Sequence, residues 1–496
     1  MLKTQDMLKR PLNNFVSAVK NLWASKLFKL CLALMVIVGF SLFFEEAAIV
    51  LCVIVLVLSC FLPVSDAFGM LLFFYPFFSI FVFKGVNLYF VLFAAVVGVQ
   101  AVKHLIGAIK KEQKIDWFFV IAVVIYLIYI ILPIRETFDG KFKIGCDLMY
   151  LSSALAFFVM LYVVYKQKEN IDFLKGMHLF VVGFLIAGVL GWFAYVSPRL
   201  QEVMILTDYI GIDLIRFNGL FGFPNTLAIV GLIAESAVFY LQYKKKIGNI
   251  GYLYNALIFA LCYITLARSF LYAYFGGLAL FVLATIIKVK KDSWKVLLPE
   301  IAGIILVMLV LFMYTKEHFG RFSADDLVNG YNNSVDAENI NQIADPGRGG
   351  LIKIYVKDFL SSIMVILFGR GLAAPWIGGT NCLSSHNTYL QAFWNTGIVG
   401  VILFVAVMLI IIKKYSALNS KTLIKSVFTD FGNYILILPI LAIMFIENLF
   451  MNMQMIIAVM VVVFAICSVK MNKKTEEKFE EKLEEKEIEI IAKNEQ

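Results

Sequence analysis

Long apolar stretches separated by short polar breaks fill most of the chain. From Leu30 to Val469, runs of mostly apolar residues recur with only a few charged residues between them. A helix that crosses the hydrocarbon core of a bilayer needs about 17 to 25 such residues. The pattern therefore predicts an all-α polytopic membrane protein.

We expect about 14 transmembrane helices, with about 12 as the lower limit. The predicted spans cover residues 27–44, 47–64, 67–83, 86–106, 115–134, 146–165, 177–196, 222–243, 249–266, 269–287, 296–314, 387–412, 433–449 and 452–469. The turns at Glu45-Glu46 and Ser65-Asp66 are very short, so the alternative is a re-entrant hairpin among the first three stretches. Loss of one pair of spans leaves the two termini on the same side.

The spans divide the chain into an N-terminal segment at residues 1–26 and a transmembrane domain at residues 27–469. Within this domain, residues 315–386 form a large polar loop. Residues 470–496 form a tail rich in Glu and Lys, which is typical of a solvated helix or a disordered segment. We assign no chemistry to the tail.

The composition excludes an ordinary soluble protein. Apolar residues make up 61% of the chain, its mean hydropathy is +0.85, and charged residues make up 16%, against roughly 25% in a typical soluble domain. A soluble fold cannot bury this much apolar surface.

Lysines set the expected orientation, because cytoplasmic loops of membrane proteins are rich in Lys and Arg. The lysine-rich segments are the N-terminal segment, the tail and the breaks around Lys110, Lys166, Lys244–Lys246, Lys288–Lys295 and Lys413–Lys425. An N-terminus in the cytoplasm puts all of them on the inner side. We therefore expect both termini to be cytoplasmic and the 315–386 loop to be extracytoplasmic.

Arginine has the opposite distribution. All arginines except Arg10 fall in segments predicted to face outward: Arg135, Arg199, Arg216, Arg268, Arg321, Arg348 and Arg370. The planar, forked guanidinium group matches phosphate and carboxylate oxygens, so this bias predicts an outer face that binds an anion. The alternative is that single arginines extend to lipid headgroups, which explains the whole set less well.

Two outward loops, at residues 197–221 and 315–386, are longer than the others. Long loops are usually functional or disordered. In the second, the apolar periodicity of residues 351–360 is interrupted by Lys353 and Lys357, which predicts a short amphipathic helix on the outer surface. A buried loop helix is the alternative.

Three polar motifs stand at predicted outer starts of apolar helices. They are Arg216–Asn225, Leu266–Ser269 and Ser384–Leu390, the last followed by Asn395–Gly400. A helix N-terminus has free N–H groups and the positive end of the helix dipole. Three such ends, together with Arg216 and Arg268, predict a phosphate-binding site. The Arg268-Ser269 pair is the weakest signal, because such pairs are common at membrane interfaces.

His386 opens the third motif, and two roles compete for it. A histidine at a helix start usually caps the helix or donates a hydrogen bond. However, a helix N-terminus and nearby arginines disfavour imidazolium, and a neutral imidazole accepts a proton near neutral pH. That is the requirement for a general base.

Two acidic residues are further candidates, because charge inside a membrane is costly. Glu447 stands at the outer turn between the last two predicted spans, where it belongs either to the outer site or to a solvated turn. Glu235 lies deeper in its span, and we expect a paired structural role for it.

The order of these motifs resembles that of the O-antigen polymerase and O-antigen ligase family. The residues that carry the resemblance are Arg216–Asn225, Arg268-Ser269, Gly347–Gly349, Phe368–Gly371, and Ser385–Leu390 with Gly397–Gly400. The last motif is the most specific. The resemblance extends over residues 180–450, and the earlier residues match only as membrane helices.

The resemblance implies a GT-C-like membrane glycosyltransferase at the outer leaflet of a bacterial cytoplasmic membrane. Such a polymerase transfers a glycan from polyprenyl diphosphate to a sugar hydroxyl of another lipid-linked repeat unit. The residues implied for the donor diphosphate are Arg216, Arg268, Arg348 and Arg321. The residue implied for the acceptor hydroxyl is His386, supported by Asn225, Asn387 and Glu447.

The resemblance implies no metal ion and no other cofactor. Fixed arginines and helix N-termini stabilise a departing diphosphate, and no Asp-x-Asp pair occurs in the outward segments. The implied partners are the lipid-linked donor and acceptor glycans and the membrane lipids. A flippase and a chain-length regulator are further candidates, and no nucleic acid is expected.

Two other functions are alternatives. A ligase of the same family transfers the finished glycan to a different acceptor, and the Asn-rich stretch at residues 323–344 leaves the acceptor open. A polysaccharide flippase or other transporter also has many spans, but its site is expected near the midplane between repeated halves. Here no such repeat is evident, and the polar motifs gather on one face.

Overall fold

The structure is a computed structural model in which helices dominate. It describes residues 25–84, 86–110, 117–131, 144–167, 170–197, 217–221, 224–265, 267–289, 294–315, 348–371, 385–415, 431–446 and 456–462. For a few residues in these ranges, among them Arg268 and Arg348, the backbone is described and the side chain is not.

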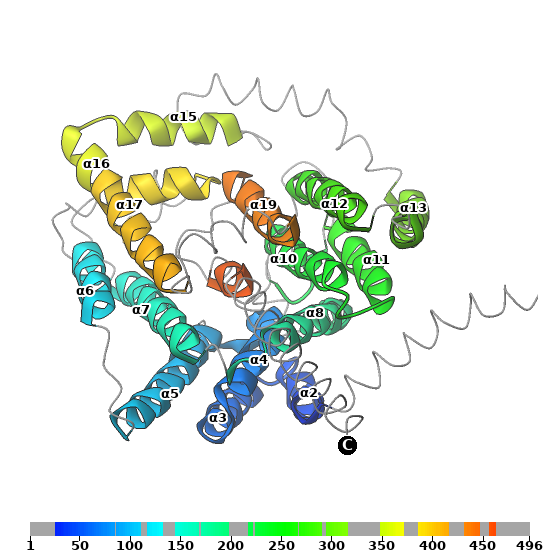
Figure 1. The fold of residues 1–496 in the computed structure, drawn as a ribbon, viewed down its shortest axis with the longest axis horizontal. Helices are drawn as coiled ribbons and strands as arrows, with labels where there is room; N and C mark the ends of the chain where they lie inside the picture. Colours follow the sequence, from blue (N-terminus) through cyan, green and yellow to red (C-terminus); the bar gives the residue numbers. More distant parts are fainter. Residues whose placement is uncertain are drawn as a thin grey trace, which may run out of the picture.

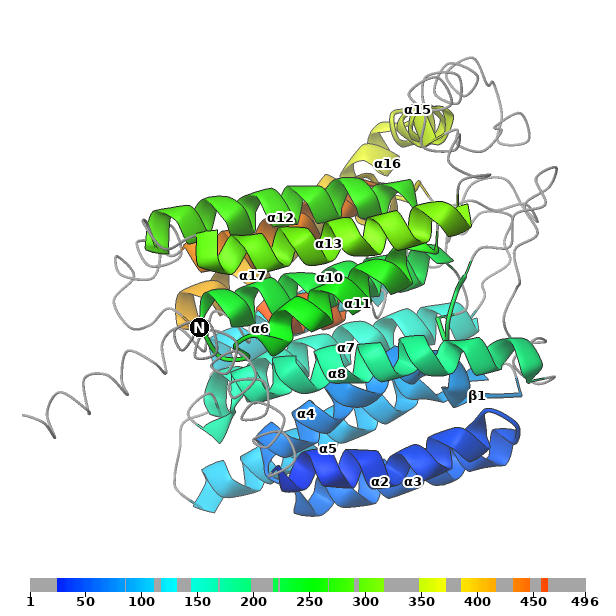
Figure 2. The same cartoon turned by 90° about the vertical axis from the view of Figure 1, so that its right-hand side faces the viewer.

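Most of the described helices lie side by side in a bundle (Figures 1 and 2). The first half comprises α2 (Lys26–Ser41), α3 (Glu45–Phe61), α4 (Val64–Phe74), the 3-10 helix η1 (Tyr75–Phe81), α5 (Leu88–Lys110), α6 (Trp117–Ile131), α7 (Ile144–Gln167), α8 (Phe173–Leu190) and the 3-10 helix η4 (Gly191–Val196). The second half comprises α10 (Pro224–Tyr243), α11 (Ile250–Tyr263), α12 (Arg268–Val289), α13 (Trp294–Thr315), α15 (Arg348–Phe359), α16 (Ile363–Phe368), α17 (Thr388–Tyr415) and α19 (Phe431–Ile446). Residues 456–462 are also helical.

Among the described residues, 7 helical segments are long and apolar enough to cross a membrane. They are Val64–Phe81, Leu88–Ile109, Phe173–Phe193, Pro224–Tyr243, Phe270–Lys288, Trp294–Leu311 and Thr388–Ile410. Shorter apolar helices are found at Val120–Tyr129, Ala154–Val164, Ile250–Tyr263 and Gly432–Phe445. The chain is therefore a helical, polytopic membrane protein.

Each predicted apolar stretch contains a described helix, although the last is described only at residues 456–462. One feature is absent from the sequence prediction. β1 (Val82–Phe83) and β2 (Val86–Asn87) pair as an antiparallel hairpin between η1 and α5. Strands of two residues are too short to show an alternating pattern, so the expectation of helices alone is wrong at this point.

Contacts at one end of the first half bring together ends of helices far apart in the sequence. The Lys175 ammonium group at the start of α8 pairs with the Asp66 carboxylate at the start of α4, at 3.0 Å. The Lys103 ammonium group near the end of α5 donates to the Leu62 carbonyl, just after α3, at 2.6 Å. These ends share one predicted membrane face.

The opposite ends of the same helices also meet. The backbone N–H of Lys84 donates to the Glu45 carboxylate at the start of α3, at 3.1 Å. The Ser197 hydroxyl, just after η4, donates to the Leu42 carbonyl at the end of α2. Because successive spans alternate in direction, the sequence predicts that all of these segments lie on the outer face of the membrane.

α10 lies inside the second half of the bundle. It packs against α8, α11, α12 and α19, and Figure 1 shows it between them. Every side chain from Leu227 to Leu241 is buried, as expected for a helix that is apolar on all sides. A polar side chain in this stretch therefore faces protein rather than lipid.

α15 and α16 lie at the margin of the bundle. In Figure 2, α12 and α13 run lengthwise, whereas α15 is seen along its own axis. Leu351 and Tyr355 bury one face of α15, and Lys353 and Lys357 are exposed on it. α15 is therefore an amphipathic surface helix, and the alternative of a buried loop helix is wrong.

Candidate functional site

α17 is interrupted at Gly397, within the most specific of the sequence motifs. This glycine has φ 65° and ψ 179°, a combination open essentially to glycine alone. The interruption divides α17 into residues 388–396, which begin two residues after His386, and residues 398–415. A helix broken inside an apolar bundle leaves carbonyl groups without their usual partners.

Three carbonyl groups just before the break accept hydrogen bonds from outside α17. The backbone N–H of Arg370 donates to the Trp394 carbonyl at 2.7 Å, and that of Gly371 donates to the Asn395 carbonyl at 2.8 Å. The Tyr129 hydroxyl of α6 donates to the Thr396 carbonyl at 2.6 Å. The break is therefore a stabilised feature of the fold, which we call the α17 clasp (residues 369–371 with 394–397).

Two glycines let the chains of the clasp approach each other. A Cβ atom on Gly369 would lie 2.5 Å from the Gly397 nitrogen, and one on Gly397 would overlap the Leu367 carbonyl. Gly369 also has a positive φ, 72°. Gly369 and Gly397 belong to two separate motifs, and both are needed for the same close backbone contact. The sequence alone does not show that these two motifs meet.

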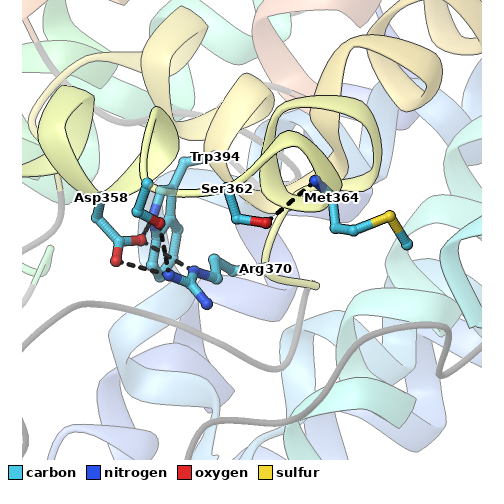
Figure 3. Close-up of polar contacts among 6 residues, drawn as sticks. Asp358, Ser362, Met364, Arg370 and Trp394 are labelled. Carbon is cyan, nitrogen blue, oxygen red and sulfur yellow. Dashed lines mark hydrogen bonds and ion pairs between the residues drawn. The ribbon is translucent and has the colours of Figure 1, made fainter.

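An ion pair ties the clasp to α15 (Figure 3). The Asp358 carboxylate accepts from Arg370 Nε at 3.0 Å and from Arg370 Nη2 at 2.8 Å, and it also accepts from Trp394 Nε1 at 2.7 Å. Such forked, charge-assisted bonds are strong. Arg370 was one of the arginines that the sequence predicts to face an external anion, but it binds a carboxylate of its own chain.

Side-chain amides extend this network from the clasp toward His386. Asn395 Nδ2 donates to the Gly371 carbonyl at 2.7 Å. Gln391 Nε2 donates to Asn395 Oδ1 at 2.7 Å, and the Ser385 N–H donates to Gln391 Oε1 at 3.2 Å. The shape of the clasp therefore sets the position of the residue before His386.

His386 occupies a strained turn at the start of α17. Its φ is 47°, a left-handed conformation that is uncommon for any residue except glycine. The Ser385 hydroxyl bridges the turn, because it donates to the Asn387 carbonyl at 2.9 Å and accepts from the Asn387 N–H at 3.3 Å. The imidazole is half-buried. Strain of this kind at a fixed position is common at functional sites.

Asn387, rather than His386, caps α17. Its Oδ1 accepts from the Leu390 N–H at 2.9 Å, as an N-cap side chain does. Its Nδ2 donates to the Phe445 carbonyl of α19 at 3.0 Å. Asn387 therefore has the capping role that was the alternative to a chemical role for His386. Asn387 also positions the turn.

The first motif forms a buried turn at residues 217–221. Phe217 stacks on Trp192, with ring centroids 4.6 Å apart. Gly219 has φ 56°, and a Cβ atom on Gly191 would lie 2.5 Å from its Cα atom. This close packing fixes the chain immediately after Arg216, which itself lies outside the described residues.

The first and second motifs lie next to each other. The Phe217 N–H donates to the Ile264 carbonyl at 3.4 Å. Ile264 is the C-cap of α11 and lies four residues before Arg268, which begins α12. The turn after Arg216 and the end of α11 are thus in contact, and convergence of the two arginine side chains, which are not described, stays a prediction.

α19 connects the second motif with the third. Gly277 of α12 packs on Pro439 of α19, where a Cβ atom would lie 3.2 Å from Pro439 Cγ. One turn further along α12, Phe281 joins the cluster that contains Ile435, one turn earlier in α19. The two helices are therefore antiparallel. Continuing this register places the start of α12, at Arg268, within about one turn of the level of Phe445, whose carbonyl accepts from Asn387.

No model of a known protein family matches this chain, and no curated protein sequence matches it. A relationship to the O-antigen polymerase and ligase family therefore stays a prediction from the motifs. In the structure, the first motif is bonded to the end of α11 just before the second motif, and α19 packs on α12 and binds Asn387 of the third.

The remaining sequence candidates have different outcomes. Arg321 and Glu447 lie outside the described residues. Arg348 is the first residue of α15, and its side chain is not described. Asn225 lies in the first turn of α10 and is half-buried.

Sequence reasoning missed the residues that hold the site together. Asp358 is a lone acid in an apolar and basic helix, and this contrast is a signal that a partner exists. Tyr129 gives no such signal, because a tyrosine is ordinary in an apolar helix. Its role depends on a fold that brings it to Thr396.

Proposed function

We propose that this chain polymerises polyprenyl-diphosphate-linked oligosaccharide repeat units into a surface polysaccharide, such as O-antigen, capsule or exopolysaccharide. The observation that carries the proposal is the antiparallel register of α12 and α19. It brings the start of α12, at Arg268, to within about one turn of the level of Phe445, which binds Asn387, the residue after His386. A cationic group for a diphosphate and a base for a hydroxyl are the two parts that this transfer needs.

In the proposed reaction, an acceptor hydroxyl oxygen attacks the anomeric carbon of the donor glycan. The bond between that carbon and the diphosphate oxygen breaks, and its electron pair leaves with the polyprenyl diphosphate. The hydroxyl proton passes to His386. Arg216 and Arg268, with Arg348 and Arg321 as further candidates, stabilise the negative charge that develops on the diphosphate. Glu447 and Asn225 would support the site, and no metal ion enters the proposal.

The proposal includes a membrane topology. About 14 spans, with residues 1–26 and 470–496 in the cytoplasm and residues 315–386 outside, place the site at the outer leaflet of a bacterial cytoplasmic membrane. The two sets of helix-end contacts in the first half support this alternation. A GT-C-like arrangement of membrane helices around an outer site is part of the same proposal.

Cysteine labelling tests the topology with two exposed lysines. Lys246 lies in the turn between α10 and α11, and Lys357 lies on α15. In intact cells, we expect an impermeant thiol reagent to label Lys357→Cys above the parent background and to label Lys246→Cys only after permeabilisation. The reverse pattern would mean that the proposed orientation is inverted.

A glycan gel tests the function in a deletion strain complemented with variants. We expect His386→Ala and Arg268→Ala to abolish polymer while the protein still inserts. Arg199→Ala, in the same outward loop as Arg216, and His104→Ala, near the end of α5, are matched controls that should keep it. Normal-length polymer from both site variants would contradict the proposed site.

The deletion strain also separates the alternatives. Single repeat units on the final acceptor indicate a lost polymerase, and full-length glycan stranded on the lipid carrier indicates a lost ligase. Donor glycan confined to the inner leaflet indicates a lost transporter. A transporter is the second candidate because Glu235 lies in the middle of buried α10, where such proteins place polar binding groups.

A further inference from the structure

Glu235 is enclosed in the core of the second half. Its side chain is 0% exposed, and it lies near the middle of α10, between α8, α11, α12 and α19. One turn before it, Gly231 brings α10 against Cys262 of α11. One turn after it, Phe239 contacts Tyr274 of α12. The carboxyl group therefore has no route to lipid headgroups.

Both carboxyl oxygens of Glu235 lack a hydrogen-bond partner among the described residues. The Tyr274 hydroxyl nearby is also buried without a partner in the described part of the chain. Within the described part of the chain, the partner expected for a paired structural role of Glu235 is therefore not found. An ionised carboxylate in such a place has nothing to offset the loss of its hydration.

A second buried acid lies in the same group of helices, in a different environment. Glu300 of α13 is 2% exposed. It accepts from Asn255 Nδ2 at 2.8 Å and from Gln242 Nε2 at 3.2 Å. Gln242 follows Glu235 by two turns on the same face of α10, and the two acids are electrostatically coupled. Two N–H donors stabilise a negative charge at Glu300, whereas Glu235 has none.

We propose that Glu235 is a proton-binding site inside the membrane domain, which takes up a proton in preference to Glu300. The proposal rests on the burial, the missing donors and the contrast between the two acids. It is independent of the proposed polymerase activity. Intramembrane carboxyl groups of this kind serve as proton relays in many membrane proteins.

The surroundings of Glu235 favour a proton over a metal ion. The described residues contain no group of three His, Cys, Asp or Glu side chains that could hold a metal. Titratable side chains around Glu235 include Cys262 of α11, which lies against Gly231, Tyr274 of α12, which contacts Phe239, and Glu300 of α13, which binds Gln242. None of the three supplies a positive charge, so a proton is the neutralising partner that the described core can accommodate.

The other helices that pack on α10 do not supply a counter-charge to it either. On α8, Lys175 is paired with Asp66, and the His178 ring bonds the Tyr254 hydroxyl at 3.1 Å. α19 has no acidic or basic residue between Phe431 and Ile446. On α12, the Lys288 ammonium group donates to the Tyr243 carbonyl at 2.8 Å, and the Arg268 side chain is not described. Among the described side chains around it, Glu235 thus has no hydrogen-bonded counter-charge, and protonation neutralises it.

Infrared spectroscopy of the full-length protein tests the proposal directly in a detergent without ester groups, because lipid ester carbonyl groups absorb where protonated carboxyl groups do. A protonated carboxyl group absorbs in its own carbonyl-stretch region, apart from carboxylates and amides. At neutral pH, we expect an absorption in this region that is lost in Glu235→Gln and kept in Glu300→Gln. Glu46→Gln, exposed at the start of α3, is the control that should leave the region unchanged.

Two results would overturn the proposal. One is a wild-type spectrum without any protonated-carboxyl absorption at neutral pH, and the other is an absorption that survives in Glu235→Gln. If Glu235→Gln does not yield folded protein, Glu235→Asp keeps an acid and should shift the absorption. An unshifted absorption in Glu235→Asp counts against the proposal equally. None of these readouts needs a glycan, so they remain informative if the polymerase proposal fails.

Discussion

α17 and α10 both place polar groups inside an apolar bundle, but they differ in whether those groups have hydrogen-bond partners. At the α17 clasp, the carbonyl groups of residues 394–396 each find a donor from another segment. In α10, the Glu235 carboxyl oxygens find none among the described residues. Unpaired polar groups are costly inside a protein or a bilayer.

The difference suggests distinct purposes for the two regions. Fully bonded polar groups make a rigid local structure, and the clasp holds the turn of His386 in one place. An acid left without donors contributes nothing to rigidity, so its retention needs another reason. Substitutions in the clasp and in the core around α10 should therefore have different effects.

The largest effect is expected from Gly397→Ala. The side chain would overlap the Leu367 carbonyl and would force a conformation reserved for glycine. We expect the free energy of unfolding to fall by about 3 kcal/mol or more, with loss of polymer, measured by thermal unfolding in detergent and a glycan gel. Gly276→Ala in α12, where nothing lies within 4 Å of a Cβ atom, is the control. Equal stability of the two variants would mean that the clasp is not rigid.

Asp358→Ala should have the next largest effect. It removes the acceptor of both Arg370 and Trp394, whose N–H groups remain in a partly buried place. We expect a loss of roughly 2 to 3 kcal/mol in the free energy of unfolding. The exposed neighbour variant Lys357→Ala should change stability by less than about 0.5 kcal/mol. A negligible effect of Asp358→Ala would show that the ion pair is dispensable to the clasp.

Glu235→Leu and Glu300→Leu should act with opposite signs. Glu235→Leu removes a group that has no hydrogen bonds to lose, so we expect stability to rise by about 1 to 2 kcal/mol. Glu300→Leu leaves the amide donors of Asn255 and Gln242 unpaired, which should cost about 1 to 3 kcal/mol. Chemical unfolding of both variants in detergent measures this. Changes of the same sign would remove the contrast between the two acids.

The smallest effect is expected from a pair of Tyr→Phe changes. Tyr129→Phe removes one bond of the clasp and should lower the free energy of unfolding by about 1 kcal/mol. Tyr274→Phe removes a buried hydroxyl that has no partner among the described residues, and it should be neutral or slightly stabilising. Thermal unfolding of both proteins side by side gives the difference. A larger loss for Tyr274→Phe would show that its hydroxyl has a partner in the native membrane.

Much of the fold could be predicted from the sequence, because the signal is local. Apolar runs between charged breaks locate helices without any knowledge of their neighbours. β1 and β2 escaped this reasoning since they are too short to have a period. The amphipathic pattern of residues 351–360 likewise predicts α15, whose bounds are Arg348–Phe359.

The candidate site could be predicted only in pieces. The sequence identifies Gly369–Gly371 and Asn395–Gly400 as motifs, but it does not show that they form one clasp. Tyr129 and Thr396 are 267 residues apart, and no local pattern links them. The sequence also predicts a partner for Glu235 that the described residues do not supply, because the presence of a partner depends on which helices surround α10. Which polar groups find hydrogen-bond partners depends on how the helices pack, and the pattern of a single sequence does not show this.

The clasp also constrains how this chain can change length. Arg370 and Gly371 supply the backbone donors that α17 lacks after Gly397, so residues 369–371 act as a detached turn of that helix. Deletion or insertion of a single residue between Phe368 and Gly371 would shift both donors out of register with their carbonyl groups. Among natural variants of this chain, insertions and deletions are therefore expected between Gly371 and Ser385. They are not expected within residues 368–371.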